Sequence, residues 1–396
     1  MSDISERLRN LTPEQQKLLK LRLKQKGIKF SEGSGKSQSA GPAPRVRDGK
    51  QRNIAFSLFY FSADGKGEGS AKYRLLMDTI KFGDENKFSA VWTPERHFQA
   101  FGGLYPNPSV LSAAIAMITK NVQIRAGSVV LPLHSPVRVA EEWGVVDNLS
   151  DGRVGISFAT GWHNHDYVIK PENFEDRREV MFRDIETVRR LWRGETLQIP
   201  GVGGEPSPVR TLPRPVQKEL PYWCTASSDR TWRRAGEIGA NVLSIIAGSL
   251  DDLERNIKIY RQARIQNGHD PRKGIVSIML HTFLDHDLEL TREKTREPLS
   301  HYLKNFLHQF SQLPGAEQYK DTDSLLDFAF ERYFNHSSLL GTPEKCAAMV
   351  DALYDIGVND LACLTDFGMD YDEVMKSLVL LAELQAQYAA DPVDAD

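Results

Sequence analysis

The chain is constrained most by an alternation of short apolar runs with longer helical patterns, which starts near Asn53 and continues almost to the end. Apolar runs that predict strands lie at 54–61, 90–93, 122–131, 153–159, 222–225, 241–246, 275–283 and 360–365. Helical patterns lie between them, at 70–87, 107–119, 135–149, 174–192, 228–238, 250–266, 288–312 and 343–356, with a last one at 372–388. Eight strands that alternate with helices predict an α/β fold of the (β/α)₈ or TIM-barrel type.

A doubly wound sheet is the alternative for such a pattern. A dinucleotide-binding fold of that kind would need a G-x-G-x-x-G run after its first strand, and the sequence has none there. The glycine-rich run at 201–204 has a different spacing and lies in a proline-rich insertion, 194–221, which we interpret as a lid. A second insertion, 285–340, is mostly helical in pattern and rich in Phe and Tyr. Insertions of this length are expected to cover the site or to form oligomer contacts.

The N-terminal residues differ from the rest of the chain. A Thr-Pro-Glu-Gln capping box at 12–15 and a glycine at 27 predict a helix over 12–26. Residues 1–30 hold eight Lys/Arg against three Asp/Glu, so this helix is basic and amphipathic, either a solvated tail or a docking element. Residues 31–52 have the composition of a flexible linker. We expect the barrel to occupy 53–390 and a tail to occupy 391–396.

Composition excludes several classes of protein. The net charge of −3 gives no reason to expect a nucleic-acid or membrane-surface partner, and no run approaches the roughly 18 apolar residues of a membrane span. No signal segment opens the sequence. Cys224, Cys346 and Cys363 are too few and too far apart for a disulfide framework or a zinc knuckle. A cytoplasmic protein is therefore expected.

Small and polar residues follow several predicted strands at their carboxyl ends, where parallel α/β folds bind ligands. Ser227 and Ser228 open the helix predicted at 228–238, whose free N–H groups and positive dipole end suit a phosphate. Simple N-capping is the other interpretation of these serines. The candidate site residues at this rim are Glu95, Arg96, His97, Gly127, Ser128, Ala159, Thr160, Gly161, Trp162, Ser227 and Ser228.

Other residue groups give weaker indications. His163, His165 and Asp166 are of types that bind metals, but three ligands within one short loop make a poor cage, and we expect no metal. His281 and His286 flank a strand end, and we interpret them as surface residues. No nucleophile elbow or nucleotide-binding P-loop motif is present.

Several motifs together resemble the bacterial-luciferase-like flavin monooxygenases over about 53–387. They lie at 92–98, 105–108, 127–142, 149–153 and 159–163. The W-x-P-E-R-H-F and A-T-G-W-H runs are similar to the branch associated with nonribosomal peptide and polyketide synthetases, the relatives of the mupirocin-pathway hydroxylase. The run at 11–19 is similar to segments that join modules of nonribosomal peptide synthetases.

The resemblance implies a monooxygenase that uses O₂ and reduced FMN. A separate flavin reductase would supply the reduced FMN, and the substrate would be an acyl or aminoacyl group on a carrier protein or synthetase module. A homodimer is implied as well. The flavin ring would lie in the barrel mouth over a non-proline cis peptide at Gly127–Ser128. The phosphate would lie near Thr160, Gly161, Ser227 and Ser228. A deazaflavin (F420) or flavin oxidoreductase and a non-catalytic flavin-binding scaffold are the alternatives.

One departure from the family pattern concerns catalysis. Luciferases have paired histidines after the glutamate of this motif, the first being a catalytic base, whereas this chain has Arg96 and then His97. Arginine stays protonated, so it cannot act as a general base. Arg96 is expected to hold an anion, such as a flavin ring oxygen or a substrate carboxylate, and His97 to be the acid/base. A structural ion pair of Arg96 with Glu95 or Asp366 is the alternative, and light emission is not expected.

Overall fold

The protein is represented by a computed structural model that describes residues 52–61, 68–161, 163–246, 248–311 and 322–388. The helix predicted at 12–26, the linker up to residue 51, the tail at 391–396 and Trp162 lie outside the described residues. None of the helices in the described ranges is long and apolar enough to cross a membrane.

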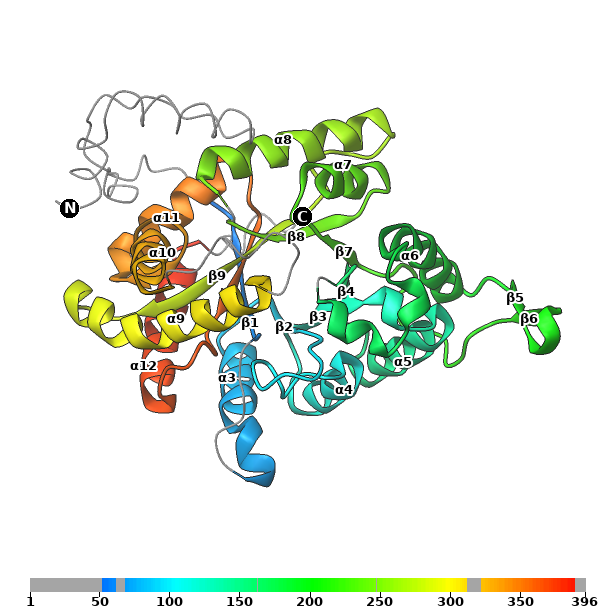
Figure 1. Ribbon diagram of the computed structural model, residues 1–396, viewed down its shortest axis with the longest axis horizontal. Helices are drawn as coiled ribbons and strands as arrows, with labels where there is room; N and C mark the ends of the chain where they lie inside the picture. The colour runs from blue at the N-terminus through cyan, green and yellow to red at the C-terminus, as the bar shows by residue number, and fades with distance from the viewer. Residues whose placement is uncertain (1–51, 62–67, 162, 247, 312–321, 389–396) are drawn as a thin grey trace. The chain divides into compact units, whose positions relative to one another are not determined.

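Eight parallel strands close into a barrel, which confirms the predicted fold (Figure 1). In order around the barrel they are β1 (Ala55–Phe59), β2 (Ala90–Thr93), β3 (Gln123–Val130), β4 (Val154–Ala159), β7 (Tyr222–Thr225), β8 (Asn241–Ile245), β9 (Val276–Leu284) and β11 (Asp360–Leu364). Pairing of β11 with β1 and of β9 with β8 completes the ring. Every predicted strand overlaps one of these, because strands buried on both faces are continuous apolar runs.

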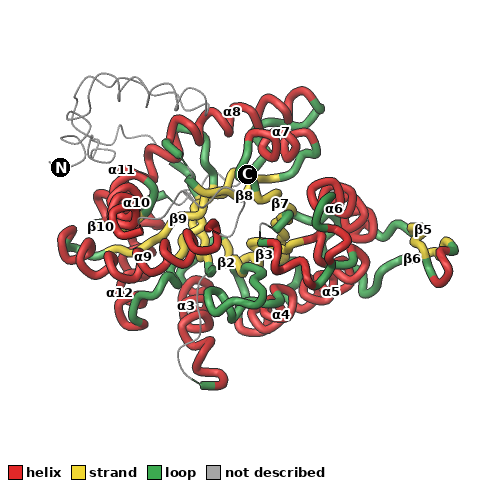
Figure 2. The backbone as a smooth tube through the Cα atoms, viewed as in Figure 1, coloured by secondary structure: helices red, strands yellow, loops and turns green. Residues whose placement is uncertain are grey.

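Helices surround the strands (Figure 2). They are α3 (Arg74–Glu85), α4 (Pro108–Ile118), α5 (Pro136–Leu149), α6 (Arg177–Arg193), α7 (Asp229–Glu237), α8 (Leu250–Gln266), α11 (Pro343–Asp355) and α12 (Tyr371–Ala386). Capping residues fix several of their starts. The Asn107 side chain accepts from the Val110 N–H at 3.1 Å. Ser249 and Asp252 form a capping box at the start of α8.

A buried ion pair lies inside the barrel near the start of β11. Arg125 Nη1 lies 2.8 Å from Asp360 Oδ2, and both side chains are almost fully buried. The Arg125 guanidinium lies 4.8 Å from the Trp92 ring centroid and 4.6 Å from that of Trp223. The barrel interior below the mouth is therefore filled by stacked side chains.

The insertion at 194–221 does not cover the mouth, so its interpretation as a lid is wrong. It connects α6 to β7 and contains an antiparallel hairpin, β5 (Leu197–Pro200) with β6 (Pro206–Val209), which projects away from the barrel (Figure 1). The Gln217 side chain donates to the Val154 carbonyl at 2.9 Å, at the start of β4. A segment that follows a helix and precedes a strand enters a barrel at the amino ends of its strands, the face opposite the ligand site.

The insertion at 285–340 follows the carboxyl end of β9 and therefore lies on the mouth side of the barrel. It contains α9 (Leu288–Ser311) and α10 (Thr322–His336) and leads into a short strand, β10 (Leu339–Gly341), which pairs with β9 outside the ring. Aromatic and aliphatic side chains of these helices join barrel residues in one core cluster, among them Tyr302, Phe330 and Phe334 with Phe59 and Trp92.

Candidate functional site

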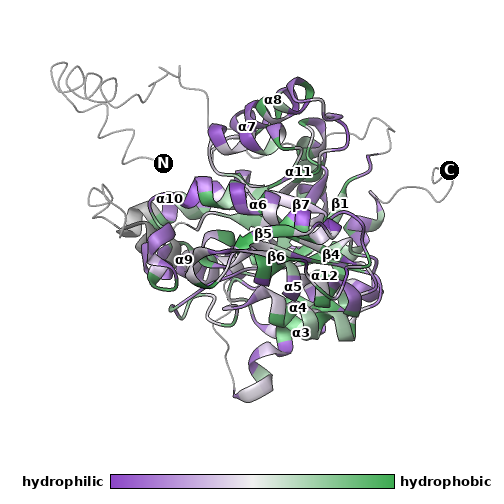
Figure 3. Ribbon diagram, turned by 90° about the vertical axis from the view of Figure 1, so that its right-hand side faces the viewer, coloured by the Kyte–Doolittle hydropathy of each residue, from purple (hydrophilic) through white to green (hydrophobic). Residues whose placement is uncertain are grey.

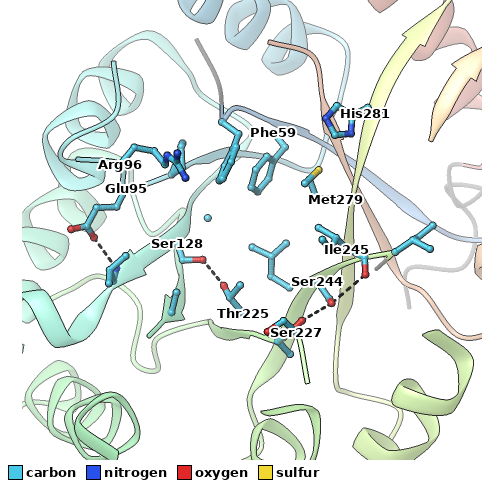
Figure 4. A pocket seen from close by; sticks show the side chains of 18 of the residues that line it. Phe59, Glu95, Arg96, Ser128, Thr225, Ser227, Ser244, Ile245, Met279 and His281 are labelled. Atoms are coloured by element: carbon cyan, nitrogen blue, oxygen red, sulfur yellow. Dashed lines mark hydrogen bonds between the residues drawn. The ribbon is translucent and has the colours of Figure 1, made fainter. Parts of the chain in front are cut away.

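A cavity opens at the carboxyl ends of the barrel strands (Figure 4). The empty space in it, counted together with its solvent-open mouth, is about 1140 Å³, and the cavity volume proper is about 220 Å³. Its wall contains most of the predicted site residues, namely Glu95, Arg96, Gly127, Ser128, Ala159, Gly161 and Ser227. His97, Thr160 and Ser228 are described but do not lie on this wall.

The floor of the cavity is formed by the carboxyl-terminal half of β3. The Gly127–Ser128 peptide bond is cis, as the family resemblance implies. A Cβ atom at Gly127 would lie 2.8 Å from the Phe59 ring and 3.1 Å from the Trp92 ring, so glycine is required by packing at this position. The Ser128 hydroxyl bonds to the hydroxyl of Thr225 at the end of β7. Thr225 is a wall residue that was not among the predicted site residues.

A second close approach occurs at the end of β4. Gly161 has a φ of +66°, and a Cβ there would lie 2.8 Å from a methyl group of Val130, so backbone rather than side chain faces the cavity. The neighbouring Thr160 is engaged within the protein. Its carbonyl accepts from the Tyr167 hydroxyl at 2.5 Å, and its hydroxyl donates to the Gly161 carbonyl at 3.2 Å.

The serines at the start of α7 differ in their positions. Ser227 lies on the cavity wall. Ser228 is the residue before the helix, but its hydroxyl caps no backbone N–H and bonds instead to the Thr231 hydroxyl at 3.1 Å. Side-chain N-capping by Ser228 is therefore absent. Asp229, the first helical residue, places a carboxylate at this helix end, which reduces its attraction for a further anion.

Glu95 is the centre of a buried hydrogen-bond cluster. Its Oε1 accepts from His97 Nε2 at 2.8 Å and from His134 Nε2 at 2.7 Å, and its Oε2 accepts from the Val130 N–H at 2.7 Å. Burial alone would raise the pKa of Glu95, but the hydrogen bonds from His134, His97 and Val130 outweigh it and hold the pKa below its ordinary value. Burial also acts against the charge on His134, yet its bond to Glu95 raises the pKa of this imidazole.

His134 was not predicted, and His97 occupies a different place from the one expected. The Nε2 of His97 is engaged with Glu95, behind the cavity wall. The ion-pair partners of Glu95 among the described residues are these two imidazoles, so the proposed Glu95–Arg96 pair is not formed.

Arg96 is the charged side chain that the motif presents to the cavity. It is only 8% exposed, and its guanidinium lies 4.8 Å from the Phe61 ring centroid and 5.1 Å from that of Phe101. Burial lowers the pKa of Arg96, and the neighbouring Tyr302 and Asp166 offset part of that shift. Arginine nevertheless remains protonated in proteins, so a fixed cation lies at this wall.

His281 corrects one interpretation made from the sequence. It is 2% exposed and lies on the cavity wall, whereas His286 is exposed as expected. Burial lowers the pKa of His281 to about 3, so the imidazole is neutral at physiological pH. Ser277, Met279 and His281 are two residues apart along β9 and therefore lie on the same face of the strand. This face is turned toward the barrel interior, so His281 points inward and not to the surface.

The fold and this cavity define a TIM-barrel protein with its ligand site at the carboxyl ends of the strands. A profile for the family described as "Luciferase-like monooxygenase" matches residues 53–360, and the chain belongs to that family. The resemblance to luciferase-like flavin monooxygenases is thereby confirmed, while the assembly-line branch stays a prediction.

Individual relatives agree with this family. The alkanal monooxygenase alpha chain of the Kryptophanaron alfredi symbiont is 23% identical over 320 residues, covering 74% of this chain and 86% of that protein. The oxygenase component of the flavin-dependent trigonelline monooxygenase of Acinetobacter baylyi is 21% identical over 362 residues, covering 86% and 97%. The oxygenating constituent of 3,6-diketocamphane monooxygenase of Pseudomonas putida, solved in complex with FMN, has the same fold, with a TM-score of 0.70, 19% identity and coverage of 86% and 99%.

Proposed function

We propose that this protein is the oxygenase component of a two-component flavin monooxygenase of natural-product biosynthesis. It would take reduced FMN from a separate flavin reductase and use O₂ to hydroxylate an acyl or aminoacyl group held on a carrier protein or synthetase module. The observation that carries the proposal is the cavity at the strand ends, whose wall brings together Gly127, Ser128, Gly161 and Ser227. The relative described as an oxygenase component supports a separate reductase.

The cavity suits FMN at the places where backbone replaces side chain. Ser128 and Thr225 would contact the ring system beside Gly127, and Gly161 and Ser227 would lie toward the phosphate. Bound reduced FMN would supply the two electrons with which O₂ is activated for insertion of one oxygen atom into the substrate. Ala159 also lies on this wall, whereas Thr160 and Ser228 remain predictions for the phosphate end and Trp162 remains a prediction for cofactor binding.

The charged residues would have separate roles. Arg96 would hold an anionic group of flavin or substrate against the wall, because it is a buried permanent cation. Glu95 would keep His97 and His134 in place through the hydrogen bonds that its Oε1 accepts from them. Tyr302 and Tyr333, which line the cavity from α9 and α10, would exclude water from it.

Oxygen uptake tests the enzymatic part of the proposal. The protein is mixed with a flavin reductase, a nicotinamide cofactor and FMN, and O₂ consumption in the presence of candidate carrier proteins is compared with the same mixture lacking the protein. Intact-mass analysis of the carrier protein should show the addition of about 16 Da, as for one oxygen atom. Uptake that never exceeds the free-flavin background would contradict the monooxygenase proposal.

Two alternatives give different results in the same assay. A deazaflavin- or flavin-dependent oxidoreductase with this fold would be active with the reduced cofactor, but no oxygen atom from O₂ would enter its product. A scaffold module would bind FMN with no turnover at all.

The three cysteines of the chain are free and buried, which supports the proposed location in a reducing cytoplasm.

We also propose that the protein is a homodimer. Large apolar side chains are exposed on α4 and α5, which lie side by side at one face of the barrel (Figures 1 and 3). They are Val110, Met117 and Ile118 on α4 with Val145 and Leu149 on α5. Exposed apolar groups clustered in this way favour association. Light scattering during gel filtration would give the mass of a dimer for the proposal and of a monomer against it.

A further inference from the structure

One wall of the cavity is aromatic and lies away from the predicted flavin contacts. His281 on β9 packs edge-on against the rings of Tyr302, Tyr333 and Phe367, with centroid separations of 4.4, 5.5 and 5.5 Å and interplanar angles of 85°, 87° and 77°. Figure 4 shows His281 on the side of the cavity opposite Ser128. Since α9 and α10 supply the two tyrosines, this wall belongs to the part of the site that the insertion at 285–340 adds.

The Nε2 atom of His281 is buried and has no hydrogen-bond partner among the described residues. A buried polar atom without a partner carries a free-energy penalty, and such atoms are rare in folded proteins unless a ligand or water satisfies them. The neutral ring offers one donor and one acceptor and carries no charge, because burial holds its pKa far below its ordinary value. It therefore suits a neutral hydrogen-bonding group rather than an ion.

The surroundings of His281 indicate the shape of the group that reaches it. Phe61 continues the wall, and Phe101 packs behind it, since the Phe101 centroid lies 5.1 Å from that of Tyr302 and 6.0 Å from that of Phe61. Aromatic rings prefer to pack on one another edge-on or offset at such separations.

We propose that this wall receives the substrate, and that it selects an aromatic ring with a neutral hydrogen-bonding substituent, of which a phenol is the simplest, with His281 as the partner of that substituent. The proposal rests on the proposed monooxygenase function, because it assigns the remaining part of the same cavity to the substrate. The acyl or aminoacyl group presented by a carrier protein would then be an aryl one. His281 acts here as a specificity-determining residue.

Phenol and toluene provide the test, since the two molecules have nearly the same size and differ in a hydroxyl against a methyl group. Each is titrated by calorimetry into the FMN-loaded full-length protein. A purely apolar wall would favour toluene, which is the more hydrophobic. We expect phenol to bind more tightly, and the substitution His281→Phe, which keeps the ring and removes both nitrogens, to weaken phenol about tenfold relative to toluene. The matched control is His286→Phe, an exposed histidine nearby in sequence, for which the ratio should stay that of the unmodified protein.

Toluene binding as tightly as phenol to the unmodified protein would overturn the proposal, and so would an unchanged ratio in His281→Phe. If that variant does not fold, the unmodified protein decides, because ¹⁵N-labelled His281 should change its ring-nitrogen chemical shift with phenol and not with toluene. FMN binding is measured separately by flavin fluorescence. Failure to bind FMN would count against the proposed function, and the phenol and toluene titrations of the flavin-free protein would still test the wall.

Discussion

Glu95 offers the sharpest test of the site, because three donors converge on one buried carboxylate. Replacement by alanine leaves the Val130 N–H buried without a partner, at about 1–3 kcal/mol. It also removes side-chain carbon that is fully buried, at about 0.8 kcal/mol per methylene. His134 is partly exposed and can bond to water in the variant, so the loss of its hydrogen bond to Glu95 adds less to the destabilisation. Glu95→Ala is therefore expected to lower the free energy of unfolding by about 3–5 kcal/mol.

Glu95→Gln has the same shape and a different expected result. The amide oxygen can accept from the Val130 N–H while the amide NH₂ donates to both imidazoles, provided that His97 and His134 are neutral and present unprotonated Nε2 atoms. All partners remain satisfied, and only the charge-assisted part of the interactions is lost, about 1–2 kcal/mol. The pKa of His134 should fall, because the carboxylate that raises it is gone.

The assay combines equilibrium urea unfolding of the two variants with NMR titration of the histidine ring protons. The expected order of stability is the unmodified protein, then Glu95→Gln, then Glu95→Ala. Two results would refute the reasoning: equal stability of the two variants, or a His134 titration that does not move in Glu95→Gln. Equal stability would mean that the Val130 N–H finds another partner in Glu95→Ala. An unchanged His134 titration would mean that Glu95 does not raise the pKa of His134.

Three further predictions follow from buried contacts. Asp360→Ala leaves the Arg125 guanidinium buried without its counter-ion and should cost about 3–5 kcal/mol in urea unfolding, whereas Asp360→Leu combined with Arg125→Met should cost less than the single change. Gly127→Ala places a methyl group 2.8 Å from an aromatic ring, so we expect a loss of about 1–3 kcal/mol and weaker FMN retention, measured by flavin fluorescence. Stability should depend on pH through the lowered pKa of Glu95 and the raised pKa of His134. The Glu95 contribution is present above the unfolded value of 4.5 and is lost as pH falls through the folded pKa, while that of His134 is present below 6.5 and is lost as pH rises through its folded pKa. The urea midpoint, measured between about pH 3 and 9, should fall at both the acidic and the alkaline end. In Glu95→Gln this dependence of the midpoint on pH should be weaker.

The sequence was sufficient for the barrel because the information for it is local. Each strand buried on both faces is an apolar run, and each helix carries its own periodicity and cap. The face on which an insertion lies is a property of topology, and the lid interpretation of 194–221 failed because composition was considered without it. That segment follows α6 and precedes β7, an order that alone places it at the amino ends of the strands.

The site was predicted where it depends on position along strands and missed where it depends on tertiary pairing. Gly127 and Ser128 lie in the carboxyl-terminal half of β3, so their place toward the mouth of the barrel follows from the strand assignment. His134 bonds to a carboxylate 39 residues earlier, a distance that no local pattern encodes. His281 could have been found, since Ser277, Met279 and His281 share one face of a predicted strand by their spacing of two.

The three residues of the Glu-Arg-His run, Glu95, Arg96 and His97, have separate positions in the structure. Both oxygens of Glu95 accept hydrogen bonds, and Oε1 accepts from His97, whose side chain does not line the cavity. Arg96 lines the cavity and keeps its charge at every physiological pH. The Glu95 cluster and bulk solvent are two routes by which a proton can reach this site. A pH profile of activity that follows the titration of His134 and disappears in Glu95→Gln would support the first route, and a profile unaffected by that substitution would support the second.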